Sequence, residues 1–215
     1  VYQYRIATIE MNALSFAVLY VLVDFLFFVY HFVAHHVRFF WATHCVHHAS
    51  EYMNFTTAMR QSTLYPLAAI WAFFLPAALL GFEREWIFFV LALNLAYQFF
   101  LHTQWVGKLP RPVEWLFNTP SHHRVHHGRN PRYIDRNFGG TLIVFDRMFG
   151  TFAAEDPDEK PDYGITRQVY SFNPVELTIH EWRDLWRDIS QPGSVAVRLK
   201  HLWAGPEWRR DSAQE

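Results

Sequence analysis

Histidine is the residue type whose number and spacing stand out in this chain. The 215 residues include 13 histidines, and four of them lie within residues 119–128, which read Thr-Pro-Ser-His-His-Arg-Val-His-His-Gly. The same His-x-x-His-His spacing occurs at residues 44–48, and a histidine pair four residues apart precedes it. Residues at i, i+3 and i+4 lie on one face of a helix, so each cluster is expected to direct its imidazoles one way. The histidines expected to converge are His31, His35, His44, His47, His48, His123, His126 and His127.

Converging imidazoles indicate a transition-metal site, because their nitrogens bind iron, copper, zinc and nickel. Cys45 is the only cysteine, which excludes an intrachain disulfide and a cysteine-rich zinc site. So many nitrogens exceed what one tetrahedral zinc ion needs. They suit two metal ions with positions left open for a substrate. A two-iron centre that activates dioxygen is the reading we favour, because inserting oxygen into an unactivated C–H bond needs a strong oxidant.

The remaining five histidines differ in their expected roles. His102 follows an apolar stretch and is expected to join the same site as a ninth ligand. His36 and His122 point about 100° from their neighbours on a helix, and we expect them to surround the site or to act as occasional ligands. A lone histidine is usually solvated or hydrogen-bonded, which is the expectation for His180 and His201.

Three apolar stretches, near residues 12–30, 64–81 and 86–101, are each long enough or nearly long enough to cross a bilayer as a helix. Asp24 is the only charged residue in the first of them. The predicted fold is therefore all-α: one domain over residues 1–215, an integral membrane helical bundle of about three to four spans with a cytosolic histidine-rich helical cap over residues 102–215. A very apolar soluble helical core is the alternative.

This topology places all the histidine clusters on one face of the membrane. The loops on that face carry Arg38, Arg60 and Lys108, whereas the turn at residues 81–85 has Arg84 between two glutamates. Positive charge is enriched on cytoplasmic loops, so we expect the metal site on the cytoplasmic side.

Local signals predict how the polar half is organised. Thr119 and Pro120 are a good helix start, with Gly128 as the stop. Asn173 followed by a proline predicts the start of an amphipathic helix over residues 175–189, and Gly150 is expected to end the helix before it.

Other function classes lack support in the sequence. Nineteen Lys and Arg against twenty Asp and Glu give a net charge of −1, and no nucleic-acid motif accompanies them, so no nucleic-acid partner is expected. There is no phosphate-binding glycine loop, nucleophile elbow or dinucleotide fingerprint.

The order of the histidine motifs resembles that of the fatty acid hydroxylase/sterol desaturase superfamily of membrane di-iron enzymes. Residues 41–48, 54–62 and 117–131 are similar to the alkylglycerol monooxygenase-like members, including bacterial ones, and residues 137–142 and 149–152 extend the similarity. The resemblance implies these iron ligands: His31, His35, His44, His47, His48, His102, His123, His126 and His127.

The resemblance also implies a lipid substrate, such as a fatty acyl, ether-lipid or sterol-like chain, and hydroxylation or desaturation with O2. Two iron ions are the expected cofactor, with zinc able to substitute in a purified protein. Electrons would come from tetrahydrobiopterin or a separate redox protein. Relatives commonly have Arg and an acidic residue where this chain has Phe32 and His36. The acidic position is associated with pterin use, which argues against the pterin here.

Two other functions remain open from the sequence. One is a histidine-rich membrane protein that binds or transports metal, whose ligands are expected near mid-membrane rather than at span ends. The other is a zinc-dependent membrane lipid hydrolase, which would act without oxygen.

Overall fold

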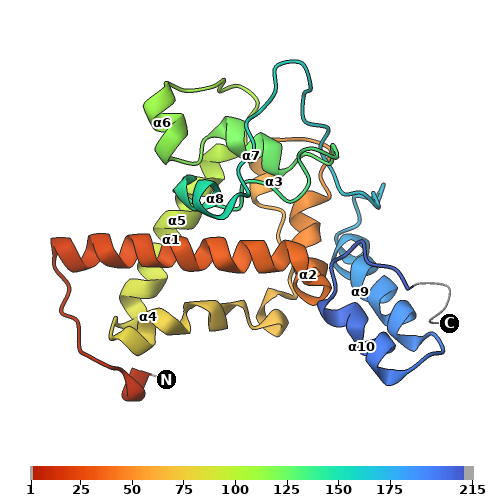
Figure 1. Cartoon of the computed structure of the whole chain (residues 1–215), viewed down its shortest axis with the longest axis horizontal. Coiled ribbons are helices and arrows are strands. Elements are labelled where there is room, and N and C mark those ends of the chain that lie inside the picture. Colours follow the sequence, from red (N-terminus) through yellow and green to blue (C-terminus); the bar gives the residue numbers. More distant parts are fainter. Residues whose placement is uncertain (1, 211–215) are drawn as a thin grey trace.

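The computed structural model describes residues 2–210, and this part of the chain is helical (Figure 1). Over that range it has no β-strand, only two isolated bridges, Phe117–Leu142 and Gly128–Tyr163. The all-α prediction is confirmed. The elements in order are η1 (Tyr2–Tyr4), α1 (Ala13–His36), α2 (Arg38–His48), α3 (Phe55–Ala58), η2 (Tyr65–Ala68), η3 (Ile70–Phe74), α4 (Leu75–Leu80), α5 (Arg84–Leu101), α6 (Arg111–Leu116), α7 (Pro120–His126), α8 (Val144–Phe149), α9 (Pro174–Ser190) and α10 (Val195–Trp203).

The long helix α1 is the axis of the fold, and α5 crosses it (Figure 1). Asn12 caps its start by accepting from the backbone of Leu14 and Ser15, and the Ser15 hydroxyl completes a capping box. Twenty-four residues span about 36 Å. Among residues 2–210 it is the one helix long and apolar enough to cross a membrane. The helix predicted near residues 12–30 is thus confirmed, and it continues through His36.

The segment at residues 64–81 does not form the single predicted helix. It consists of η2, η3 and the six-residue α4, with Ala69 between the first two in the left-handed region at φ 51°. Pro66 and Pro76 lack the N–H that a continuous helix needs, which favours this break. The prediction of one helix over residues 64–81 is therefore wrong, whereas the helix predicted near residues 86–101 exists as α5.

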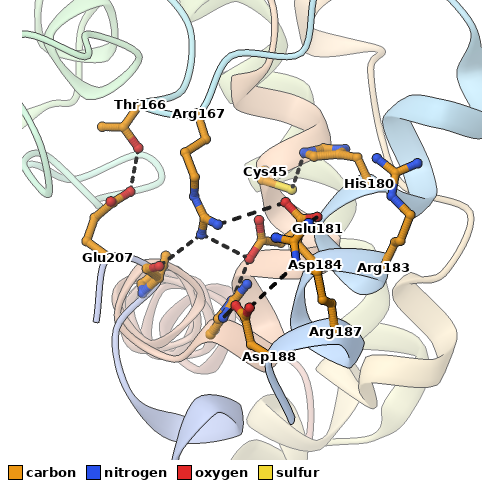
Figure 2. A network of polar contacts seen from close by, with 12 residues as sticks. Cys45, Thr166, Arg167, His180, Glu181, Arg183, Asp184, Arg187, Asp188 and Glu207 are labelled. Carbon is orange, nitrogen blue, oxygen red and sulfur yellow. Dashed lines mark hydrogen bonds and ion pairs between the residues drawn. The ribbon is translucent and has the colours of Figure 1, made fainter. Parts of the chain in front are cut away.

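Only Val37 lies between the end of α1 and the start of α2, so the chain turns sharply at this residue. The buried Arg38 donates to Glu181 and Asp188 on α9, with both N–O distances 2.6 Å. Figure 2 shows the surrounding network, in which Arg167 also reaches Glu181. Removing one partner of a buried ion pair is costly, so these contacts fix α2 against the C-terminal helices.

The helix signals in the polar half behave as the sequence predicts. Thr119 caps α7 by accepting from the backbone N–H of His122, and Asn173 caps α9 by accepting from Val175. Gly150 ends α8 at φ 75°. α7 ends at His126 with His127 as its C-cap, so Gly128 follows the cap directly, at the position predicted for the stop.

Candidate metal centre

All nine histidines predicted as ligands come together, and they do so in two buried groups. Within each group, one potential ligand atom from every residue lies within 4.8 Å of the others. The five-histidine group consists of His31, His35, His44, His48 and His126. The four-histidine group consists of His47, His102, His123 and His127.

Each His-x-x-His-His box contributes to both groups in a crossed pattern. The outer histidines of α2, His44 and His48, join the five-histidine group, and the middle one, His47, joins the four-histidine group. At residues 123–127 the assignment is reversed, with the middle residue His126 in the five-histidine group. On a helix the residue at i+3 lies about 60° to one side of residue i and i+4 about 40° to the other, which makes such a split feasible.

The ring nitrogens within each group are close enough to bind one cation. Six contacts between Nε2 atoms measure 2.9 to 3.2 Å, for example His31–His44 at 2.9 Å and His102–His123 at 3.0 Å. Ligands at about 2.1 Å from a metal are about 3.0 Å apart at neighbouring octahedral positions and about 3.4 Å apart in a tetrahedron. The spacing therefore fits nitrogens around a metal ion.

Hydrogen bonds on the far side of several rings fix where the lone pairs point. The Nδ1 atoms of His31, His102 and His126 each lie 2.9 Å from a backbone carbonyl oxygen. A carbonyl only accepts, so Nδ1 carries the proton and Nε2 presents a lone pair to the group. The Nε2 of His126 is buried and has no hydrogen-bond partner. Converging lone pairs repel unless a cation lies among them, so the donor set fits a metal.

Burial keeps these imidazoles neutral, which is the form that binds metal. It lowers the pKa of His102 to about 4. The pKa values of His44, His47, His123 and His127 are also well below the usual range, first because of burial and then because of neighbouring histidines.

The other histidines stay outside both groups in the described residues. His36 stacks on Phe32 and bonds through Nδ1 to that residue's carbonyl. His122 lies 2.8 Å from Glu114. His180 and His201 are hydrogen-bonded, the former to the Leu177 carbonyl and the latter to Arg210, as expected for structural histidines.

A large apolar cavity ends at both histidine groups. Its volume is about 430 Å³, within the range of small-molecule sites. Apolar side chains of α1, η3 and α5 form most of its wall, and the polar exceptions besides histidines are two tyrosines and two glutamines. The histidines in the wall are His31, His44, His47, His102 and His123.

Sequence reasoning missed the groups that hold the ligands in place. The Tyr65 hydroxyl lies 3.0 Å from His44 Nδ1, and Asp135 lies 3.3 Å from His35 Nδ1. His31 is bonded to the carbonyl of Phe138, in a segment that the sequence marked only as a resemblance to relatives. Such contacts join residues up to 107 positions apart, so spacing gives no signal for them.

Comparison with known proteins identifies the family of the chain. The family model described as fatty acid hydroxylase matches residues 16–151, a range that contains all nine histidines. Alkylglycerol monooxygenase from Xenopus tropicalis is 43% identical over 187 residues, covering 86% of this chain and 41% of that protein. The human protein of that name is 41% identical over the same shares.

A more distant relative is the ornithine lipid hydroxylase OlsE of Rhizobium tropici, 26% identical over 69% of this chain and 45% of its own length. No solved structure matches the chain. The chain spans about two fifths of the length of the alkylglycerol monooxygenases it matches. A model match over more than half of the chain nevertheless settles the family. The chain belongs to the fatty acid hydroxylase family.

Proposed function

We propose that this protein is a membrane-bound, non-haem di-iron oxygenase that hydroxylates the alkyl chain of a lipid with O2. The observation that carries the proposal is the apolar cavity whose wall includes histidines of both groups. Relatives named for alkylglycerol and ornithine-lipid hydroxylation support an alkyl-bearing lipid as substrate. α1 supports a membrane location, and the cytoplasmic side follows from the positive loops.

The residues divide the work between ligation and substrate binding. The five-histidine group and the four-histidine group would hold one iron ion each. A bound pair of iron ions supplies the oxidising power for inserting one oxygen atom of O2 into an unactivated C–H bond; the other leaves as water with two electrons from a reductant and two protons. That reductant is a redox protein or a pterin.

The cavity wall binds the alkyl chain and excludes water from its reacting end. Phe27, Phe74 and Leu91 provide apolar contact, and the chain is thereby directed toward the histidines. Gln61 and Gln98 have the amide side chains of this wall. Gln61 Nε2 lies 3.5 Å from His47 Nδ1, and the backbone carbonyl of Gln98 accepts from His102 Nδ1. The two amide side chains would bind a polar atom of the lipid near the attacked carbon.

The proposal is tested with purified protein in lipid nanodiscs, loaded with iron and supplied with an alkylglycerol, a chemical reductant and ¹⁸O2. A product that contains one ¹⁸O atom and requires both iron and oxygen is the expected result. Lipid cleavage that proceeds without oxygen would establish the zinc hydrolase instead. For protein reconstituted in closed liposomes, metal movement across the membrane without oxygen consumption would establish the transporter.

A matched pair of variants on α5 tests the cavity. Leu91 lines it, whereas Leu93 on the same helix faces outward with 39% of its surface exposed. Leu91→Trp should lower turnover of long chains while leaving the iron content unchanged, because the larger side chain fills the cavity. Leu93→Trp should retain turnover.

A further inference from the structure

The loop at residues 138–142 is held by two buried carboxylates that the proposed reaction does not use. Asp146 on α8 accepts from the backbone N–H of Phe138 and Gly139, both at 2.7 Å. Asp24 on α1 accepts from the N–H of Thr141 at 2.7 Å and of Leu142 at 2.9 Å. Both carboxylates are completely buried. Two acids thus bind four N–H groups of a five-residue loop.

One peptide unit links this arrangement to a predicted ligand. The peptide between Phe138 and Gly139 accepts from His31 Nδ1 through its carbonyl and donates through its N–H to Asp146 Oδ2. The orientation of the peptide therefore fixes both the tautomer and the ring direction of His31. The Nε2 of that ring points to His44, inside the five-histidine group.

The loop is closely packed at its two glycines. A Cβ atom on Gly139 would lie 2.4 Å from the carbonyl oxygen of Leu142, and one on Gly140 would lie 2.7 Å from Asp24 Oδ1. Asn118, just before α7, donates its side-chain amide to the carbonyl of Gly139 at 2.6 Å. The loop is thus fixed against α1, α8 and the start of α7.

We infer that Asp24 and Asp146 are positioning residues: by clamping the loop at residues 138–142 they hold the Phe138 carbonyl on His31 and so assemble the five-histidine group for metal. This inference rests on the proposed function, since it assumes that the group binds a metal ion. Burial raises the pKa of Asp146 to about 6, so the carboxylate is ionised at neutral pH and can accept from all its donors.

Asparagine is the sharpest replacement, because it keeps the size and removes one acceptor. In Asp146→Asn the amide NH2 must face either the N–H of Gly139 or the N–H of Phe138 together with the Thr151 hydroxyl. In Asp24→Asn it must face the N–H of Leu142 or that of Thr141. Two donors then oppose each other in a buried site, which displaces the loop. Loss of such an outer contact typically lowers metal affinity about 10- to 100-fold.

The experiment is a stepwise cobalt(II) titration of the full chain in nanodiscs, followed by absorption. The step that is lost in His35→Ala belongs to the five-histidine group, and the step that is lost in His127→Ala belongs to the four-histidine group. In Asp146→Asn and Asp24→Asn the five-histidine step should weaken about 10- to 100-fold, with the four-histidine step unchanged. Asp162→Asn, a surface carboxylate paired with Arg129, should behave like wild type.

The titration distinguishes failure of metal binding by the histidine groups from failure of the positioning role of Asp24 and Asp146. Suppose that the wild type shows two steps, and that Asp24→Asn and Asp146→Asn either keep both affinities or lose both steps equally. The positioning role of the two aspartates is then wrong, whereas the two metal sites remain supported. If wild type binds no cobalt and no iron, the proposed function itself fails, and the positioning role with it.

Discussion

The five-histidine group and the four-histidine group are built from the same two boxes but are supported differently. In the five-histidine group, four of the rings have an Nδ1 partner outside the group: the Phe138 and Arg136 carbonyls, the Asp135 carboxylate and the Tyr65 hydroxyl. In the four-histidine group, His102 is held by the Gln98 carbonyl, His47 has a 3.5 Å contact to Gln61, and the Nδ1 of His123 is buried without a partner.

The difference indicates a division of roles. Outer hydrogen bonds orient ligands and raise metal affinity. The five-histidine group is therefore expected to bind its metal more firmly. The four-histidine group lines the cavity with three of its four members and is expected to hold the more exchangeable ion beside the substrate.

The crossed arrangement of the boxes predicts the largest effects. His47→Ala should remove metal from the four-histidine group and His126→Ala from the five-histidine group, each with a loss of activity above about 100-fold, since a ligand contributes more than an outer contact. Cobalt titration and turnover of each variant measure this. Full metal loading and full activity in His47→Ala would contradict the assignment.

A pH dependence of the metal-free protein follows from burial at His102. Its pKa falls from 6.5 to about 4 on folding, so between these values the unfolded state binds the proton more readily. Proton binding at His102 does not reduce the free energy of unfolding above pH 6.5. As the pH falls from 6.5 to about 4, this one group lowers the free energy of unfolding by about 3 kcal/mol. Thermal unfolding of chelator-treated protein across that range should show a steep decline, less steep in His102→Ala. Identical profiles for the two proteins would exclude this origin.

Exchange kinetics distinguish the groups in a milder way. A chelator should remove metal from the four-histidine group about 10-fold faster, because fewer hydrogen bonds fix its rings. Stopped-flow absorption of the cobalt-loaded protein resolves the two phases, and His35→Ala and His127→Ala assign them. Faster loss from the five-histidine group would reverse the comparison.

The smallest effect is expected at Tyr65, whose hydroxyl supports His44 from η2. Tyr65→Phe removes this contact but keeps the ring, so affinity at the five-histidine group should fall by up to about 10-fold. Tyr52→Phe, in which a 63%-exposed tyrosine loses the same hydroxyl, is the control. If the metal affinity of the five-histidine group is unchanged in Tyr65→Phe, the Tyr65 hydroxyl does not contribute to metal binding there.

Spacing along the helices predicted eight of the nine histidines that come together, and the ninth, His102, was predicted from its position after an apolar stretch. Histidine boxes encode a face of a local helix, and caps such as Thr119 encode where that helix begins. The crossed membership of His47 and His126 depends on how α2 and α7 are tilted against each other, which no local pattern specifies. The break at Ala69 was missed because the helix over residues 64–81 was predicted from hydrophobicity, which does not report backbone conformation; Pro66 and Pro76 were the local signal for it.

The supporting contacts show the same limit. Asp24 was visible as a lone charge in an apolar stretch, but its partners at Thr141 and Leu142 lie more than a hundred residues away. Asp135 and Phe138 had no signal of their own. Contacts of this kind arise from tertiary packing, so a sequence alone identifies candidate ligands more readily than the groups that orient them.

We expect the nine histidines to form two adjacent iron sites at the end of one apolar cavity. Anomalous X-ray scattering from crystals of the iron-loaded protein tests this arrangement most directly. Two iron peaks are expected, one among His31, His35, His44, His48 and His126 and one among His47, His102, His123 and His127. A single peak, or iron bound away from these residues, would contradict it.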